Sequence, residues 1–131
     1  IEKFCIRGKI LEVGCGVGSF LDEAQKRGWE VRGVEISKWA SDYCVDKKDI
    51  IVHQGTLKTC NYNKNYFNTI LYYHAIEHIV DPVSELKLAG SFLKRNGFIV
   101  IGVPNLRSFQ AKKHGLRWSA LIPEHIYLFV A

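Results

Sequence analysis

Short apolar runs are spaced regularly along most of this chain. Runs of this kind, bounded by polar or turn residues, are typical of strands that are buried on both faces of a parallel sheet. They predict five strands, at residues 9–13, 30–34, 50–53, 67–73 and 98–103.

Between these runs the apolar residues are spaced three or four positions apart, as in amphipathic helices. The pattern predicts a helix over Ser19–Arg27 that ends at Gly28, a helix capped by Ser37, and a helix that begins at Pro82. Residues 56–65 are predicted as loop, and Asn96-Gly97 as the turn before the fifth strand. Alternating strands and helices predict an α/β fold, a doubly wound, mainly parallel sheet with helices on both faces.

The segment Ile10–Gly18 predicts a binding turn at the end of the first strand. Gly14, Gly16 and Gly18 stand at alternate positions, and a helical pattern follows at once. Glycine allows positive φ and lets a ligand approach the main chain, so we expect a small, adenosine-like molecule here. The dinucleotide pattern G-x-G-x-x-G would need glycine where Ser19 stands, so the spacing disfavours NAD.

Residues with binding chemistry follow every predicted strand. In an open parallel sheet, ligands bind beyond the carboxyl ends of the strands, where the strand order reverses. At these ends the sequence places Gly14–Gly18, Glu35, Gly55-Thr56, Tyr72–His74 and Pro104-Asn105. Glu35 ends the second strand, where a carboxylate can accept hydrogen bonds from both hydroxyls of a ribose.

Glu12 is an acid inside an apolar strand. An unpaired buried charge costs several kcal/mol, so this side chain requires donors. Backbone amides of the glycine turn and the ammonium group of a cofactor are both candidates. A structural brace for the turn is an equally good interpretation.

Composition and length indicate the class of protein and the number of domains. The chain has 131 residues, 47% of them hydrophobic and 24% charged, which is typical of a globular protein, and we expect one domain over residues 1–131. No apolar run approaches the roughly 20 residues of a membrane span, and no signal-peptide pattern is present, so a cytoplasmic location is expected. The chain opens at Ile1, contains no Met and ends in an apolar run, so we expect a fold truncated at one or both ends.

Cysteine spacing and net charge limit the kinds of metal site, disulfide and binding partner that are expected. Cys5, Cys15, Cys44 and Cys60 form no C-x-x-C pair, which predicts free thiols rather than a thiolate zinc site or a disulfide framework. The formal charge of +5 is spread along the chain, apart from a modest cluster at Lys112-Lys113 and Arg117, so nucleic acid is not the expected partner.

Glu12 followed by G-x-G-x-G resembles motif I of the class I S-adenosylmethionine-dependent methyltransferases. The resemblance implies a Rossmann-like methyltransferase fold, with S-adenosyl-L-methionine as cofactor and S-adenosyl-L-homocysteine as product. The cofactor-binding residues that it implies are Glu12, Gly14, Cys15, Gly16, Gly18, Glu35, Ile36, Thr56, Leu57 and Tyr73. This chain departs from the family at Thr56 and Asn68, where the family often has acids.

The segment Tyr72–Pro82 has two competing interpretations. Its H-x-x-E-H string also occurs as the zinc signature of inverted metalloproteases, with His74 and His78 as ligands and Glu77 as base. That site needs a long helix, for which a chain that leaves a strand at His74 and breaks at Asp81-Pro82 has too little room. The same segment resembles the strand-four motif of the branch that includes the ubiquinone-biosynthesis O-methyltransferases, so no metal is expected.

The resemblance to this branch continues through Ser91–Ile101, Val103–Asn105, Trp118 and Pro123–Phe129. It implies that the last of these segments lies on the acceptor side. His125 is the first candidate for a general base and His74 the second, because a neutral imidazole suits proton abstraction near neutral pH. A structural role is the alternative for each histidine. Five aromatic residues are candidates for the acceptor pocket: Tyr72, Tyr73, Phe109, Trp118 and Tyr127.

The function favoured by the sequence is methyl transfer to a small-molecule acceptor, at an oxygen atom, by in-line displacement. Methylation of RNA or protein is the second hypothesis, and a nucleotide-binding Rossmann domain of another class is the third. A continuous basic face beside the crevice would favour RNA. The acceptor and the oligomeric state are not predicted.

Overall fold

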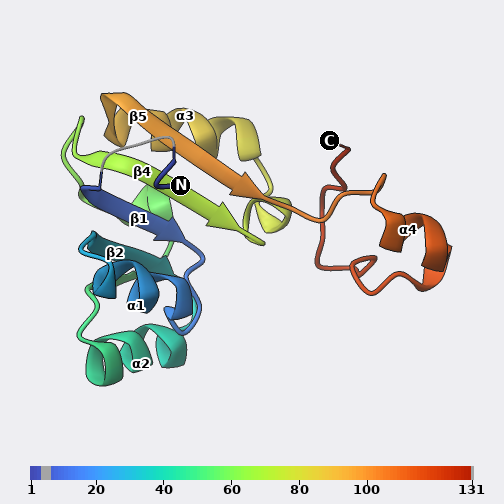
Figure 1. The fold of residues 1–131 in the computed structure, drawn as a ribbon, viewed down its shortest axis with the longest axis horizontal. Coiled ribbons are helices and arrows are strands. Elements are labelled where there is room, and N and C mark those ends of the chain that lie inside the picture. Colours follow the sequence, from blue (N-terminus) through green and yellow to red (C-terminus); the bar gives the residue numbers. More distant parts are fainter. Residues whose placement is uncertain (4–6, 131) are drawn as a thin grey trace.

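A computed structural model describes residues 1–3 and 7–130, and it confirms the α/β sheet (Figure 1). All strand pairs are parallel, and the strand order is β3-β2-β1-β4-β5. The strands are β1 (Lys9–Val13), β2 (Glu30–Glu35), β3 (Val52–Gln54), β4 (Phe67–Tyr73) and β5 (Leu93–Gly102).

The helices are α1 (Ser19–Lys26), α2 (Lys38–Lys48), α3 (Pro82–Phe92) and α4 (Phe109–His114), with 3₁₀ turns η1 (Leu57–Thr59), η2 (Ile76–His78) and η3 (Gly115–Arg117). Three of the four helices in the described part of the chain, α2, α3 and α4, begin at a side-chain cap, whereas α1 follows Gly18. The Ser37 hydroxyl accepts a hydrogen bond from the Ala40 amide at 3.3 Å, and Asp81 accepts one from the Ser84 amide at 3.0 Å. Both caps satisfy first-turn amides that have no partner within the helix.

The sheet separates two apolar cores, because successive residues of a strand point to opposite faces. On one face Ile10 and Val31 pack with residues of α1 and α2, such as Leu21 and Cys44. On the other face the core contains Leu11, Val34 and Ile70 of the strands, with Leu57, Ala89 and Phe92 from η1 and α3. The chain therefore winds in both directions from β1, and the strand order reverses between β1 and β4.

The structure corrects the predicted start of the fifth strand. β5 begins at Leu93 instead of Phe98, and its register against β4 shifts, since Leu93 pairs with Phe67 whereas Phe98 pairs with Thr69. The extra residues bulge at the predicted Asn96-Gly97 turn. A Cβ at Gly97 would lie 3.0 Å from the Lys94 carbonyl oxygen, so glycine fits this tight bulge.

Residues 103–130, here called the C-terminal segment, extend beyond the carboxyl end of β5 and carry α4 (Figure 1). The segment folds back so that the Ile126 amide donates to the Glu77 carbonyl at 2.9 Å and the Tyr127 hydroxyl donates to the Val80 carbonyl at 2.8 Å. The sequence did not predict α4. The described part of the apolar run that ends the chain forms one isolated β-bridge, in which Phe129 pairs with Asn105.

Three cysteines lie among the described residues, Cys15, Cys44 and Cys60, and all three are free thiols as predicted. Cys5 lies outside the described residues. No helix in the described part of the chain is long and apolar enough to cross a membrane.

The core on the α3 face should depend strongly on Phe67. This side chain is fully buried and makes edge contacts with Tyr62 and Tyr66 at centroid distances of 4.9 and 5.0 Å. We expect Phe67→Ala to lower the free energy of unfolding by about 3–5 kcal/mol, since it leaves a cavity. Urea unfolding measures the change. Phe109→Ala is the control, because Phe109 is 74% exposed and its loss should change stability by no more than about 0.5 kcal/mol. Equal effects of the two variants would contradict the core assignment.

Candidate active site

The glycine turn joins the end of β1 to α1 and is held against β2. The Gly14 and Cys15 amides both donate to the Val34 carbonyl, at 2.8 and 3.2 Å. Gly14, Gly16 and Gly18 all have positive φ, at 74°, 52° and 67°. A Cβ at Gly14 would lie 2.9 Å from the Ala75 Cβ, whereas a Cβ at Gly16 would meet no atom of the described residues within 4 Å. The turn is therefore packed beneath Gly14 and open at Gly16, where a ligand can approach the main chain.

The Glu35 carboxylate links this turn to the loop that follows β2. One oxygen accepts a hydrogen bond from the Gly16 amide and the other from the Ser37 amide, both at 2.8 Å. Glu35 is only 8% exposed. Each carboxylate oxygen retains a second lone-pair direction, so the group can also accept from a ligand's hydroxyls. These contacts hold the carboxylate in one orientation at the edge of the sheet.

Glu12 is the second acid at this edge, and it is 5% exposed. Its Oε2 atom is buried and has no hydrogen-bond partner among residues 1–3 and 7–130. Burial raises the pKa of this carboxyl from 4.5 to about 8. A cation bound beside it would supply the missing partner, and this is the chemistry of the ammonium group of S-adenosylmethionine.

The other predicted cofactor residues line the same edge in different ways. Ile36 follows Glu35 and is 72% exposed, an apolar surface beside a polar turn. The Gly55 amide donates to the Glu35 carbonyl at 2.9 Å, which brings the loop containing Thr56 and Leu57 to the end of β2. The Leu57 side chain is fully buried in the core, so only its backbone can face a ligand.

Two more predicted residues, Cys15 and Tyr73, complete the set at this edge. Cys15 is buried between the turn and α2, and burial raises the pKa of its thiol, so this side chain fills space and is a poor nucleophile. Tyr73 ends β4 and is mostly exposed. Its partner across the sheet is Gly102 at the end of β5. The structure therefore places the ten predicted cofactor residues at or next to the carboxyl ends of the strands, but the side chains of Cys15 and Leu57 are buried in the two cores, so these two residues can offer a ligand only their backbone.

His74 directly follows β4 in a left-handed conformation, with φ of 53°. Its Nδ1 lies 3.3 Å from the Glu77 Oε1, and its ring contacts the Tyr73 ring at a centroid distance of 4.6 Å. A carboxylate accepts a hydrogen bond from Nδ1–H, which leaves Nε2 as the basic nitrogen. The side chain is half exposed at the edge of the sheet. His74 therefore has the surroundings of a general base.

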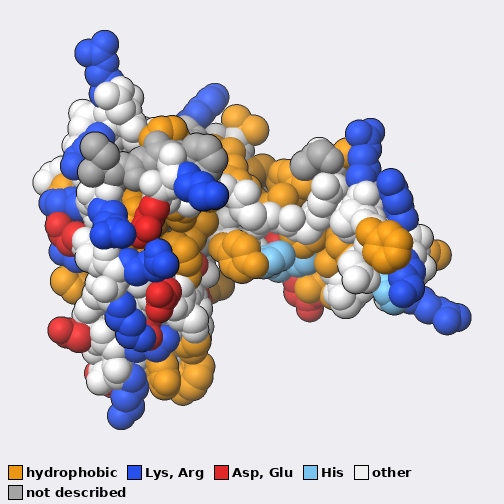
Figure 2. Space-filling view, viewed as in Figure 1, with side chains coloured by type: hydrophobic (Ala, Val, Ile, Leu, Met, Phe, Trp, Pro, Cys, Tyr) orange, Lys and Arg blue, Asp and Glu red, His pale blue; other side chains and the backbone are white. Residues whose placement is uncertain are grey.

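His125 lies beside His78, with the ring centroids 4.8 Å apart. The Nδ1 of His78 is 2.8 Å from the Glu124 carbonyl oxygen, and the Nδ1 of His125 is 2.8 Å from the Ala120 carbonyl oxygen. Figure 2 shows histidine side chains in pale blue at the junction between the sheet and the C-terminal segment. Sequence reasoning missed this pairing, because the two residues are far apart in the chain and no local pattern connects them.

The metalloprotease interpretation has no structural support. His78 ends η2, a single 3₁₀ turn over Ile76–His78, and His74 lies outside it. The two histidines therefore do not share a helix face. Glu77 is instead fully buried beneath both, with Oε2 lacking a hydrogen-bond partner in the described part of the chain.

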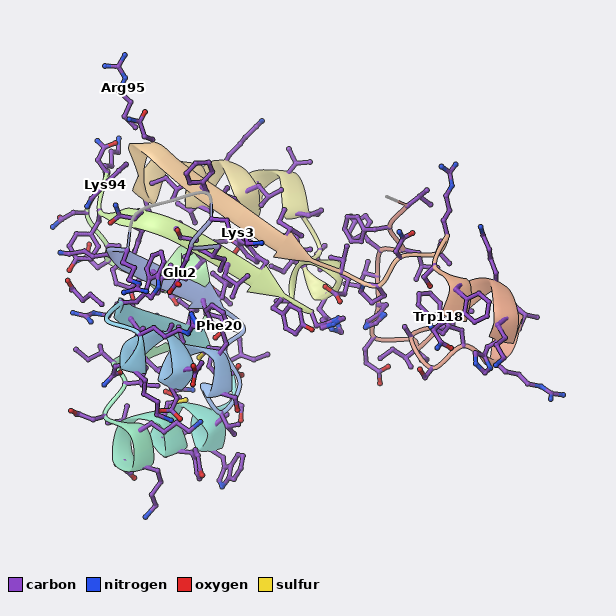
Figure 3. All side chains as sticks on the ribbon, viewed as in Figure 1. Glu2, Lys3, Phe20, Lys94, Arg95 and Trp118 are labelled. Atoms are coloured by element: carbon purple, nitrogen blue, oxygen red, sulfur yellow. The ribbon has the colours of Figure 1, made fainter. Side chains whose placement is uncertain are left out.

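The predicted aromatic pocket is only partly assembled. Tyr72 is wrong as a pocket residue, because it is fully buried and its hydroxyl donates to Glu85 at 3.4 Å, inside the core. Trp118 lies within the C-terminal segment beside α4, away from the sheet (Figure 3). Phe109 is on α4 and largely exposed. Tyr73 and Tyr127 lie at the junction that contains His74 and the loop after β4.

Comparison with known proteins identifies relatives of this chain. The family model described as "Methyltransferase domain" matches residues 6–131. A ubiquinone biosynthesis O-methyltransferase of Bradyrhizobium diazoefficiens is 27% identical in an alignment of 125 residues that covers 87% of this chain and 49% of that protein. The enzyme of the same name from Histophilus somni is 26% identical over 113 residues, 79% of this chain and 47% of that protein. The chain thus spans about half the length of these relatives.

Solved structures share the fold. A crystal structure of an S-adenosylmethionine-dependent methyltransferase from Thermotoga maritima has a TM-score of 0.80 at 22% identity, covering 99% of this chain and 61% of that one. One from Archaeoglobus fulgidus has a TM-score of 0.76 at 26% identity, covering 97% of this chain and 57% of that one.

The raised pKa of Glu12 predicts a pH dependence of stability. Between pH 4.5 and about 8 the folded protein holds a proton that the unfolded chain has lost, so the free energy of unfolding should fall as pH rises through this window. The free energy of unfolding of Glu12→Gln should equal that of the wild type near pH 5. Above pH 8 it should exceed the wild-type value by an amount on the order of a few kcal/mol.

Urea unfolding at a series of pH values measures this effect in the absence of ligand. Glu23→Gln is the matched control, because Glu23 is exposed on α1 in a surface ion pair with Arg27 and its substitution should leave the wild-type pH dependence intact. The same slope in Glu12→Gln and wild type would show that Glu12 is not the buried acid responsible.

Proposed function

The chain belongs to the class I S-adenosylmethionine-dependent methyltransferases, and on this premise we propose that it transfers a methyl group to an oxygen atom of a small-molecule acceptor. S-adenosyl-L-methionine is the cofactor of this family, and S-adenosyl-L-homocysteine is its product. The observation that carries the proposal is the buried Glu35 carboxylate, which is hydrogen-bonded to the open glycine turn at Gly16.

Each residue at the sheet edge has a proposed role in holding the cofactor. Glu35 accepts hydrogen bonds from the ribose hydroxyls, and Gly16 lets the nucleoside lie against the main chain. Glu12 pairs with the ammonium group, directly or through water, which satisfies its buried oxygen. The exposed side chain of Ile36 packs against the adenine ring, whose polar edge faces the backbone of Thr56 and Leu57.

The cofactor, when bound, supplies a methyl group on a sulfonium whose sulfur departs as a neutral thioether, so little covalent help is required from the protein. The chain's own residues hold the acceptor in line and exclude water. Positioning of this kind can lower a barrier by about 7–11 kcal/mol. Tyr73, which ends β4 beside Gly102, is proposed to line the position where the acceptor approaches.

A hydroxyl acceptor must also lose a proton, and we assign its removal to His74. The carboxylate of Glu77 holds the Nδ1 of His74, so that Nε2 is the nitrogen that accepts a proton. His125, which the sequence ranks first, is bonded instead to a backbone carbonyl and lies beside His78. His74 also directly follows β4 at the carboxyl end of the sheet, and this position favours His74.

The Bradyrhizobium and Histophilus relatives support an oxygen acceptor, because both are ubiquinone biosynthesis O-methyltransferases. The cytoplasmic location expected from the sequence stays a prediction, as does a single domain over residues 1–131.

RNA is the second candidate acceptor, on one observation. The C-terminal segment carries Arg107, Lys112, Lys113 and Arg117 but a single acid, Glu124, and Figure 2 shows basic side chains on its outer surface. Methylation of RNA in place of small hydroxylated molecules would favour this candidate.

Glu35→Ala should weaken S-adenosylmethionine binding about 10- to 100-fold, because it removes charge-assisted hydrogen bonds to the ribose. Isothermal titration calorimetry with S-adenosylmethionine, S-adenosylhomocysteine and NAD measures the affinities. Glu30→Ala is the control, since Glu30 is exposed at the opposite end of the same strand. Tight binding of NAD alone, or equal affinity in Glu35→Ala and wild type, would overturn the cofactor assignment.

His74→Ala should lower kcat by about 100- to 10,000-fold while leaving the Kd for S-adenosylmethionine unchanged, because His74 acts on the acceptor. Release of S-adenosylhomocysteine is followed with a panel of small phenols and catechols as acceptors. His114→Ala, at the exposed end of α4, is the control and should keep wild-type kcat. A wild-type kcat in His74→Ala would remove His74 from the reaction.

A further inference from the structure

Glu77 presents a chemical problem that the proposed methyl transfer leaves unsolved. The side chain is 0% exposed, and Oε1 lies 3.3 Å from the Nδ1 of His74. Its other oxygen, Oε2, is buried and has no hydrogen-bond partner among the described residues. A buried carboxylate oxygen without a donor is costly, so a cation or donor beside it would be stabilising.

Two histidines, His78 and His125, lie near the Glu77 carboxylate in the arrangement typical of metal ligands. The Nδ1 atoms of His78 and His125 are each 2.8 Å from a backbone carbonyl oxygen. A carbonyl only accepts, so in each neutral ring Nδ1 carries the proton and Nε2 has the free lone pair. Metal-binding histidines are oriented in this way, by a hydrogen bond from the nitrogen that does not bind the metal.

The three residues are also close enough to share one ion. One potential ligand atom from each of Glu77, His78 and His125 lies within 4.8 Å of the others. In a tetrahedral zinc site with bonds of about 2.0–2.1 Å, ligand atoms are about 3.4 Å apart. The longest of these separations would therefore shorten by about 1.4 Å. The rings of His78 and His125 are partly exposed to solvent and have room to move.

We propose that Glu77, His78 and His125 form a binding site for one divalent cation, with Zn²⁺ as the favoured ion. Two imidazoles and one carboxylate suit Zn²⁺, whereas Mg²⁺ and Ca²⁺ prefer oxygen ligands alone. Three protein ligands leave a fourth position open. The site differs from the metalloprotease arrangement, because Glu77 is a ligand instead of a base and the second histidine comes from the C-terminal segment.

The site lies where the acceptor is expected. His74, which contacts Glu77, follows the end of β4, and the Glu77 carbonyl accepts hydrogen bonds from the Ile126 and Tyr127 amides at 2.9 and 3.2 Å. The cation would therefore fasten the C-terminal segment to the loop after β4. It would also hold an oxygen of the acceptor at its open position, a role that rests on the proposed methyl transfer.

The test uses tag-free protein stripped of metal with a chelator. Calorimetric titration with ZnCl₂ should give one site per chain, and Co²⁺ should give the absorption bands of a four-coordinate site. His78→Ala, His125→Ala and Glu77→Gln should each weaken Zn²⁺ binding at least about a hundredfold, since each removes a ligand. His114→Ala, on a histidine outside the cluster, should bind Zn²⁺ as wild type does.

A measurement on the wild type protects the test against unfolded variants. Long-range ¹H–¹⁵N correlation spectra of the histidine rings should show protonated Nδ1 on His78 and His125, with Nε2 of both shifted by Zn²⁺. No Zn²⁺ bound, no shift at these rings, or equal affinity in the three variants would each overturn the site.

S-adenosylmethionine titrations of the same samples separate the two proposals. Zn²⁺ bound at these residues without S-adenosylmethionine binding would sustain the metal site and refute the methyl transfer. The reverse result would refute the metal site alone.

Discussion

Two hydrogen bonds to one carboxylate hold the candidate active site together. The oxygens of Glu35 accept from the Gly16 amide and from the Ser37 amide, so a single side chain fixes the turn after β1 and the loop after β2. Both loops contribute residues to the cofactor edge, and neither belongs to the ladder of the sheet. Because Gly16 has positive φ, its amide points toward β2, and Glu35 provides the acceptor there. These two hydrogen bonds fix the positions of three features: the open surface at Gly16, the exposed Ile36 and the cap of α2 at Ser37.

The same edge carries buried acids whose protein partners are incomplete. Glu12 and Glu77 each have one oxygen without a hydrogen-bond partner in the described part of the chain. Glu12 lies near the end of β1, and Glu77 lies in η2, the turn that follows the neighbouring strand β4. An apolar core normally excludes such groups, and a buried carboxyl oxygen without a donor favours a cationic ligand beside it. Glu12 faces the cofactor side and Glu77 the C-terminal segment. The division matches the two proposed roles, one acid for the ammonium group of the cofactor and one for a metal cation.

Most of the sheet could be predicted from sequence, because strand runs, caps and the glycine turn are local signals. Lys9–Val13 and Phe67–Tyr73 have the predicted bounds. α3 begins at Pro82 as predicted, because proline is favoured at the first position of a helix. The start of β5 was not predictable, since the residues around Asn96-Gly97 look like a hairpin-type turn and their pairing with β4 depends on a bulge. The position of His125 beside His78 could not be predicted from the sequence either. It depends on a chain reversal that brings residues 124–127 against Glu77 and Val80, and such a contact leaves no periodic trace in the sequence.

The two halves of the proposed site therefore differ in how they are built. The proposed cofactor half is formed by loops that leave adjacent parallel strands, so the hydrogen-bond ladder of the sheet fixes their spacing. The proposed acceptor half depends on the C-terminal segment, which contacts the loop after β4 through a few hydrogen bonds and the pair of histidine rings and packs Val103 and Phe129 against the core. A segment that lies outside the ladder of the sheet can change its exposed residues without disturbing the strands. Acceptor choice is thus expected to reside in residues 103–130, and cofactor binding in the turns after β1 and β2. A cation shared by Glu77, His78 and His125 would then be the strongest single link between these halves.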